Sequence, residues 1–170
     1  MGKANLHPDF KAFLKSLNSA GVRYLLVGGY AVNFHGYHRH TEDIDVWIAI
    51  DPENLKKVSQ ALQSFGGFSP SQVAPEAFAR PGHVFMFGRE PVRIDILTGP
   101  SGVDFDRCWQ RRGQFDLDGV TVSIISLDDL KTNKRASGRP KDIADLASLP
   151  SKPLWPKKSR PRKRPGTGHK

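Results

Sequence analysis

The sequence predicts an α+β fold, a mixed β-sheet of about four to five strands with helices packed on one face and a disordered basic C-terminal tail. Three observations predict it. Short apolar runs typical of strands recur between residues 24 and 125. Amphipathic segments with the period of a helix lie before, between and after them. The last twenty residues contain eight Lys or Arg, no acid and almost no apolar side chain, so they cannot offset the chain entropy that folding removes.

The chain is expected to begin with a helix and a strand. The helix is indicated by apolar residues at i, i+3, i+4 and i+7, namely Phe10, Phe13, Leu14 and Leu17. The apolar run 24–27 is typical of a buried strand, and Gly28-Gly29 ends it in a turn with unusual backbone angles. A short helix over 30–34 should follow. Its free N–H groups and positive dipole end would then lie just beyond the glycines and favour phosphate.

Residues 43–50 predict a strand with one apolar face and one acidic face. Because side chains alternate along a strand, Asp43 and Asp45 share the face opposite the apolar one. Their backbone positions are roughly 6.6 Å apart, so both carboxylates can reach a common metal ion. The two like charges repel each other, and a divalent cation with oxygen ligands relieves that repulsion.

A third carboxylate repeats this pattern. The apolar runs 83–87 and 92–97, separated by a turn with Gly88 and Pro91, predict a hairpin. In the second run Asp95 lies opposite the apolar face. If this strand neighbours the strand of Asp43, the three carboxylates form a cluster beside the phosphate-binding turn.

The remaining segments predict helices, one loop and one more strand. Asp51-Pro52 is a typical helix start, with a capping acid and a proline at the first helical position. Residues 69–82 predict a loop with at most a short helix, either a lid over a substrate or a connector. The later elements are a short helix over 103–112, a strand over 120–125, a helix from Ser126 to Ala136, and a helix from Pro140 with Ile143, Leu146 and Ala147 on one face.

Together these motifs resemble the nucleotidyltransferase superfamily with the polymerase-β-like fold. The shared pattern is Gly28-Gly29, thirteen intervening residues, Asp43-Ile44-Asp45 and later Asp95. The string from Arg39 through Thr41 to Asp45 is similar to the small bacterial branch of minimal nucleotidyltransferases and AbiEii-type toxins. Residues 134–146 resemble the C-terminal signature of that branch, so the resemblance covers about residues 24–149.

The resemblance implies transfer of a nucleoside monophosphate from a nucleoside triphosphate, such as ATP, to an acceptor hydroxyl, with release of pyrophosphate. It implies two Mg²⁺ ions, or Mn²⁺ instead, held by Asp43, Asp45 and Asp95, with Asp95 as a candidate base. The residues expected to bind nucleotide are Gly28, Gly29, Arg39, Thr41, Lys134 and Arg139.

The acceptor stays open between an RNA 3′ end such as that of tRNA, a protein hydroxyl and a small molecule. The basic tail favours RNA, because clustered Lys and Arg bind phosphates. The toxin-like branch also implies a cognate antitoxin or other partner protein. The alternative is a catalytically silent nucleotidyltransferase fold that only binds nucleotide, RNA or a partner.

Some of these residues also allow other functional interpretations. His35, His38 and His40 either bind a transition metal or belong to a polar loop beside the phosphate site. Cys108 is either a nucleophile or a packing residue. Phosphatases of the haloacid dehalogenase type need Thr or Val where this chain has Trp47, and Asp-x-Asp glycosyltransferases need a larger nucleotide-sugar domain.

Composition predicts one folded domain over residues 1–149 and a tail over 150–170. The net charge is +9, but the tail holds eight of the 26 basic residues, which leaves 18 against 17 acids in the body. The single cysteine excludes an internal disulfide. Without a long apolar run or a signal-peptide core, a cytoplasmic protein without membrane contact is expected.

Overall fold

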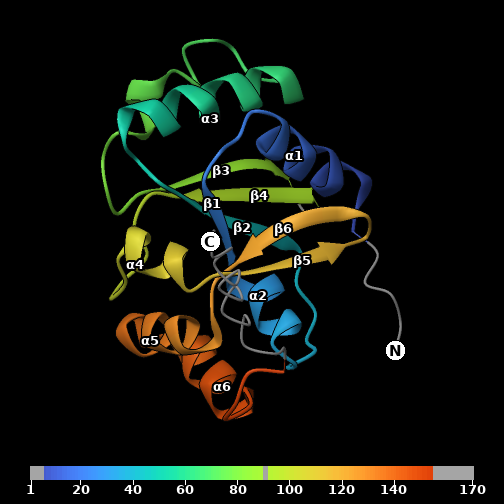
Figure 1. Cartoon of the computed structure of the whole chain (residues 1–170), viewed down its shortest axis with the longest axis vertical. Helices are drawn as coiled ribbons and strands as arrows, with labels where there is room; N and C mark the ends of the chain where they lie inside the picture. Colours follow the sequence, from blue (N-terminus) through green and yellow to red (C-terminus); the bar gives the residue numbers. More distant parts are fainter. Residues whose placement is uncertain (1–5, 90–91, 155–170) are drawn as a thin grey trace, which may run out of the picture.

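A six-stranded mixed β-sheet forms the centre of the computed structural model, which describes residues 6–89 and 92–154 (Figure 1). The strands are β1 (Tyr24–Val27), β2 (Asp43–Ile48), β3 (Val84–Arg89), β4 (Val92–Leu97), β5 (Gly113–Leu117) and β6 (Val120–Ile124), in the order β3-β4-β2-β1-β6-β5. The β2–β4 and β1–β6 pairs are parallel, and the other three are antiparallel. The expected mixed α+β fold is confirmed, with one strand more than predicted.

The predicted helices are all present. They are α1 (Pro8–Ser19), α2 (Gly28–Phe34), α3 (Pro52–Phe65), α4 (Phe105–Gln110), α5 (Leu127–Ser137) and α6 (Pro140–Ser148), with a 3-10 helix, η1 (Pro75–Phe78), in the predicted loop. The capping signals are used as expected, since Asp51 accepts a hydrogen bond from the Asn54 N–H and Ser126 from the Asp129 N–H. One bound differs, because α2 starts at Gly28 itself and not after the two glycines.

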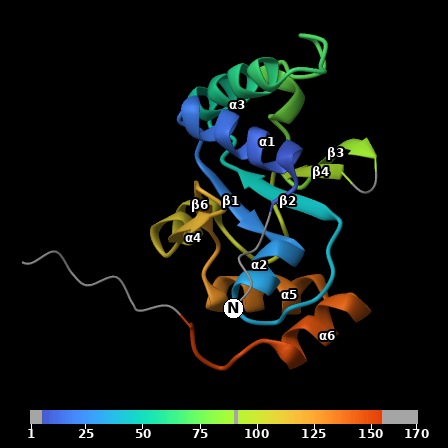
Figure 2. The ribbon, with the colours of Figure 1, turned by 90° about the vertical axis from the view of Figure 1, so that its right-hand side faces the viewer.

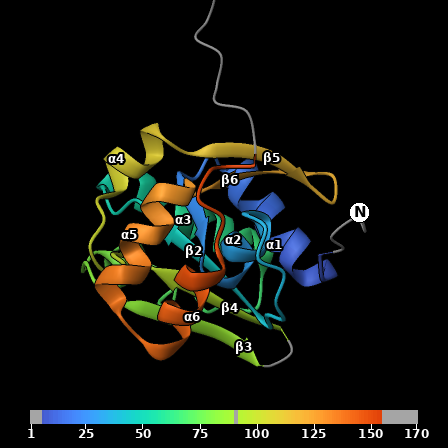
Figure 3. The ribbon, with the colours of Figure 1, turned by 90° about the horizontal axis from the view of Figure 1, so that it is seen from below.

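The two longest helices, α1 and α3, cover one face of the sheet, while shorter helices lie on the other side (Figure 2). Helices therefore lie on both faces and not on one face as predicted. The predicted apolar stripe of α1 is buried, from Phe10 to Leu17. On the opposite face the Trp47 ring packs edge-on against Phe105 of α4, with 5.1 Å between ring centroids. Viewed from below, α5 and α6 lie beneath the sheet (Figure 3). The acidic face of β2 therefore opens toward α2, α5 and α6.

Strand β5 is the element that the sequence reasoning missed. It pairs with β6 through the turn at Asp118-Gly119, where both residues have positive φ, 53° and 81°. An Asp-Gly pair at a two-residue turn is a strong hairpin signal. The apolar pattern of β5 is nevertheless weak, because its alternating polar residues, Gln114 and Asp116, are exposed.

Helix α6 does not bury the apolar side chains that the sequence places on one face. Ile143 is 59% exposed, whereas Asp142 and Asp145 are almost fully buried. The reason is electrostatic, because both acids form buried ion pairs with Lys134. A carboxylate with a cationic partner can lie inside a protein where an unpaired one cannot.

Two further expectations concern the ends and surroundings of the chain. The predicted tail has only residues 150–154 within the described part, and residues 155–170 lie outside it. Across residues 6–89 and 92–154, none of the helices combines the length and the apolar character needed to cross a membrane.

Candidate active site

The three predicted carboxylates lie on one face of the sheet because β2 and β4 are parallel neighbours. In their register Asp45 stands opposite Asp95, and Asp43 stands opposite Arg93. Residues paired across neighbouring strands point to the same face. The inferred adjacency of the two acidic strands is thus confirmed.

An arginine lies within this acidic group. The Arg93 Nη2 is 2.6 Å from Asp43 Oδ2, and its Nε is 3.2 Å from Asp95 Oδ1. A further contact of 3.3 Å joins Arg93 Nη2 to Asp95 Oδ2. The sequence reasoning missed Arg93, although its position two residues before Asp95 places it on the acidic face by the same alternation rule.

The surroundings of Asp45 strongly perturb the pKa of its carboxyl group. Burial, the charge of Asp95, a hydrogen bond with Asp95 and the charge of Asp43 together raise the pKa of Asp45 to about 7, against the opposing charge of Lys134. A carboxyl group with this pKa exchanges its proton near neutral pH. The site therefore holds more negative charge than its cations neutralise.

Neighbouring side chains leave no room for a Cβ atom at either glycine. Gly28 has φ 65°, and a Cβ at this position would overlap the Asp45 carboxylate. At Gly29 a Cβ would lie 2.5 Å from Thr41 Oγ1 and 3.2 Å from Arg39 Nη1. The backbone at the start of α2 consequently contacts both the acidic strand and the loop before it.

The three predicted basic residues all bind acids of α6. Arg39 donates two hydrogen bonds to Asp145, from Nε at 2.8 Å and from Nη2 at 3.1 Å. Lys134, only 4% exposed, has its Nζ 3.0 Å from both Asp142 Oδ1 and Asp145 Oδ2. Arg139 Nε is 2.9 Å from Asp142 Oδ2. We call these five residues the α6 ion network. Its acids stand in the C-terminal signature, but no role was predicted for them.

The carboxylates have the right chemistry for a hard divalent cation. Asp43 Oδ1 is buried and has no hydrogen-bond partner among the described residues, and all three groups offer oxygen ligands. In residues 6–89 and 92–154, however, no three His, Cys, Asp or Glu side chains already stand close enough together to enclose a metal ion. By ligand type the carboxylates fit such an ion, while the Arg93 guanidinium lies among their oxygens.

The alternative uses of histidine and cysteine find no support in the geometry. His35 is buried with Nε2 2.8 Å from the Ile125 carbonyl oxygen, and His40 pairs with Glu42 at 3.3 Å. Cys108 is buried, and burial together with Asp129 raises its pKa to about 12, so it is a poor nucleophile.

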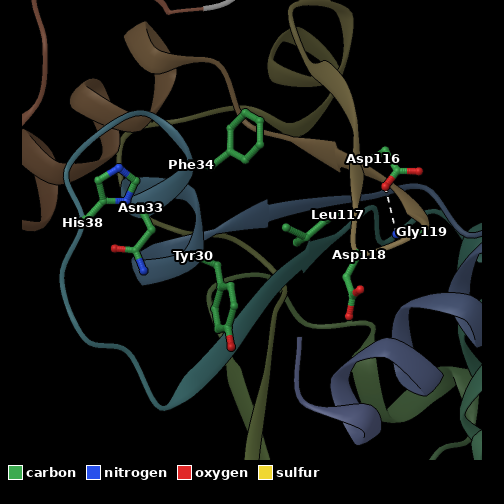
Figure 4. Close-up of a pocket in the computed structure, with 8 residues that line it drawn as sticks. All are labelled: Tyr30, Asn33, Phe34, His38, Asp116, Leu117, Asp118 and Gly119. Atoms are coloured by element: carbon green, nitrogen blue, oxygen red, sulfur yellow. Dashed lines mark hydrogen bonds between the residues drawn. The ribbon is translucent and has the colours of Figure 1, made fainter. Parts of the chain in front are cut away.

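A cavity of about 560 Å³ lies between α2 and the β5–β6 hairpin (Figure 4). Its lining includes Tyr30, Phe34, Leu117 and the acids Asp116 and Asp118. The three clustered carboxylates do not line it. The cavity borders the β5 edge of the sheet, whereas the acids stand on β2 and β4.

A mixed sheet that gathers three aspartates on one face, beside two glycines with no room for a side chain, is the arrangement that the resemblance to nucleotidyltransferases predicts. The comparisons with known proteins agree. The chain belongs to the family of nucleotidyltransferases of unknown function (DUF6036), whose model matches residues 7–150.

The fold is also found in a solved structure, and a second solved structure is a weaker match. The crystal structure of a candidate nucleotidyltransferase from Thermotoga maritima is similar, with a TM-score of 0.55 and 14% sequence identity over 81% of this chain and 88% of that chain. An antigenic nucleotidyltransferase-like protein from Paracoccidioides brasiliensis gives a TM-score of 0.47 and 22% identity over 82% of this chain and 73% of that chain. The comparison with curated protein sequences gave no match.

Proposed function

We propose that this protein is a metal-dependent nucleotidyltransferase that moves a nucleoside monophosphate from a nucleoside triphosphate to an acceptor hydroxyl. The observation that carries this proposal is the parallel register of β2 and β4, which sets Asp45 opposite Asp95 beside Gly28. A carboxyl group with a raised pKa, such as that of Asp45, is typical of a functional site.

The proposed reaction forms one bond and breaks one. The acceptor oxygen bonds to the α-phosphorus while the bond from that phosphorus to the bridging oxygen of the β-phosphate breaks, and pyrophosphate leaves. Two Mg²⁺ ions, or Mn²⁺, bound by Asp43, Asp45 and Asp95 would supply the Lewis acid for the attacking and leaving oxygens. The Asp95 carboxylate is the proposed acceptor of the hydroxyl proton.

The nucleotide-binding roles are proposed for the groups around the glycines. Because Gly28 and Gly29 lack side chains, a triphosphate can approach their backbone closely. Arg39, Lys134 and Arg139 already have carboxylate partners, so we propose that they act mainly by positioning α6 and by their positive field. Thr41 donates to the Asp43 carbonyl oxygen at 3.2 Å and is proposed to fix the entry of β2.

We propose an RNA 3′ end as the acceptor, and a toxin role with a cognate antitoxin. The RNA assignment rests on the eight basic residues among the last twenty, which favour a polyanion.

Growth measurements test the toxin role. Expression of the wild-type chain should arrest growth, and expression of the Asp45→Asn variant should not. Equal growth of both cultures would remove the toxin role.

The central experiment identifies the acceptor directly. The purified protein is incubated with each α-labelled nucleoside triphosphate, starting with ATP, together with Mg²⁺, total RNA and cell lysate. We expect label in the RNA fraction, and none with the Asp45→Asn variant. Label in protein or small molecules would change the acceptor class. Nucleotide binding without any transfer would instead support the catalytically silent alternative.

A further inference from the structure

Arg93 occupies the space between two of the proposed metal ligands. Its guanidinium donates to Asp43 on β2 and to Asp95 on its own strand, over distances of 2.6 to 3.3 Å. Strand pairing fixes this position, because Arg93 is the register partner of Asp43 and lies two residues before Asp95. Charge-assisted bonds of this kind are among the strongest that a side chain makes.

The guanidinium and a divalent ion require the same oxygen atoms. Arg93 binds Oδ2 of Asp43 and both carboxylate oxygens of Asp95, while Oδ1 of Asp43 finds no hydrogen-bond partner in the part of the chain that the structure describes. An oxygen that accepts such a bond toward a guanidinium is less available to a second cation at the same position. The positive charge of Arg93 therefore stands where a metal ion would bind.

We propose that Arg93 is a built-in counterion of the metal site, which holds Asp43 and Asp95 in place without metal and must leave them before a divalent ion binds. This inference rests on the proposed function and deepens it. Arg93 is a positioning residue that weakens the binding of free metal. A metal–nucleotide complex relieves the competition, since its phosphates offer the displaced guanidinium a new anionic partner.

Strand β3 borders the side of the acid cluster where Arg93 lies. Its register partner on β3 is Gly88, which has no side chain to block the acidic face. The next β3 residue on that face is Met86, paired with Asp95 and 65% exposed. At the register of Arg93, strand β3 therefore places no side chain on the acidic face.

The test measures Mn²⁺ binding to the full-length protein by calorimetry, without nucleotide. Three proteins are compared: wild type, Arg93→Gln, and Arg89→Gln as the control, since Arg89 is an exposed arginine of neighbouring β3. We expect Arg93→Gln to bind Mn²⁺ about tenfold more tightly than wild type. The control should stay within about twofold, because an exposed charge is screened by salt. A variant that had merely lost structure would not bind the ion more tightly.

A second measurement does not depend on metal. Without divalent ions, Arg93→Gln should melt at a lower temperature than both wild type and the control, because its acids lose their cation. Added Mn²⁺ should restore more of the melting temperature in Arg93→Gln than in wild type. If Arg93→Gln does not fold, Arg93→Lys takes its place in the test. It keeps the charge with fewer hydrogen-bond donors, so its Mn²⁺ affinity should be higher than that of wild type but by less than about tenfold.

Each other outcome overturns the inference. Equal or weaker Mn²⁺ binding by Arg93→Gln, with binding by wild type, rejects the counterion role and leaves the proposed function standing. An unchanged metal-free melting temperature rejects it as well. If none of the proteins binds Mn²⁺ with or without nucleotide, the metal-dependent function falls and the inference with it.

Discussion

Two groups of buried or half-buried aspartates in this protein have opposite electrostatic surroundings. At the β2–β4 site, burial and the nearby acids Asp95 and Asp43 raise the pKa of Asp45 to about 7. In the α6 ion network, burial alone would raise the pKa of Asp142, but hydrogen bonds from Arg139, Ser137 and Lys134 outweigh it and hold that pKa far below its usual value.

The difference separates a structural role of the α6 ion network from the chemical role proposed for the acid cluster. The α6 ion network matches its carboxylates with cations, so it fastens α5 and α6 to the loop of Arg39 and needs no ligand. In the acid cluster, Asp45 stands opposite Asp95 and Arg93 lies among the carboxylates, so a bound cation would stabilise it. Burial of an acid alone would not have distinguished the two.

The largest effect is expected from a substitution that breaks the α6 ion network. Lys134→Met leaves Asp142 and Asp145 without their buried cation, so we expect the free energy of unfolding to fall by about 3–5 kcal/mol. The control is Arg135→Met on the exposed side of the same helix, which should change it by less than about 0.5 kcal/mol. Urea denaturation followed by circular dichroism measures both. Equal stability of the two variants would show that the network does not hold α6.

The next largest effect is expected from a substitution in the acid cluster of β2 and β4. Asp45→Asn keeps the shape of the side chain but removes one ligand charge, so nucleotide transfer should fall by about a hundredfold or more. Stability should be retained or improved at pH 7, because a repelling charge is removed. The matched control, Asp142→Asn, should lose stability. A large loss of stability in Asp45→Asn would contradict the contrast between the two groups.

Acid titration sharpens the contrast further. The pKa of Asp45 is higher in the folded than in the unfolded chain, so the folded state binds more protons and its stability falls as the pH rises from about 4 to 7. For Asp142 the folded pKa is lower, so its contribution is present above about pH 4 and is lost in more acidic solution.

The measurement is urea denaturation at several pH values without divalent ions. The stability advantage of Asp45→Asn over wild type should grow by about 1 kcal/mol or more between pH 4 and pH 7. The deficit of Asp142→Asn should shrink as the pH falls below 4. An advantage of Asp45→Asn that does not change with pH would mean that Asp45 titrates normally.

Much of the acid site was predictable because strand alternation is a local rule. Once Asp43 and Asp45 are assigned to a strand, their common face follows, and the same holds for Asp95. The adjacency of β2 and β4 joins residues fifty positions apart, and no local pattern in the sequence requires it. Arg93 obeys the same alternation, so it could have been placed beside the acids from the sequence alone.

The α6 ion network was beyond such rules. Arg39 meets Asp145 across 106 positions, and no periodicity connects them. On α6 the apolar stripe predicted the face with Ile143, yet the acids are buried because their cations arrive from α5 and from the loop before β2. Amphipathic patterns predict the buried face only when burial is driven by apolar area.

The smallest effect on nucleotide transfer is expected from removal of the basic tail, which tests whether the tail acts independently of both acid groups. Removal of residues 155–170 deletes seven Lys or Arg and leaves Leu154, whose side chain lies against Gly36. Transfer to saturating RNA should be unchanged, because the tail supplies none of the carboxylates. The RNA dissociation constant at low salt should rise by about tenfold, and its dependence on salt should weaken, because fewer phosphate contacts release fewer counterions. Filter binding over a salt series measures both quantities. RNA affinity equal to that of the full chain would move RNA recognition from the tail to the folded body, whereas lost transfer at saturating RNA would place tail residues at the acid site itself.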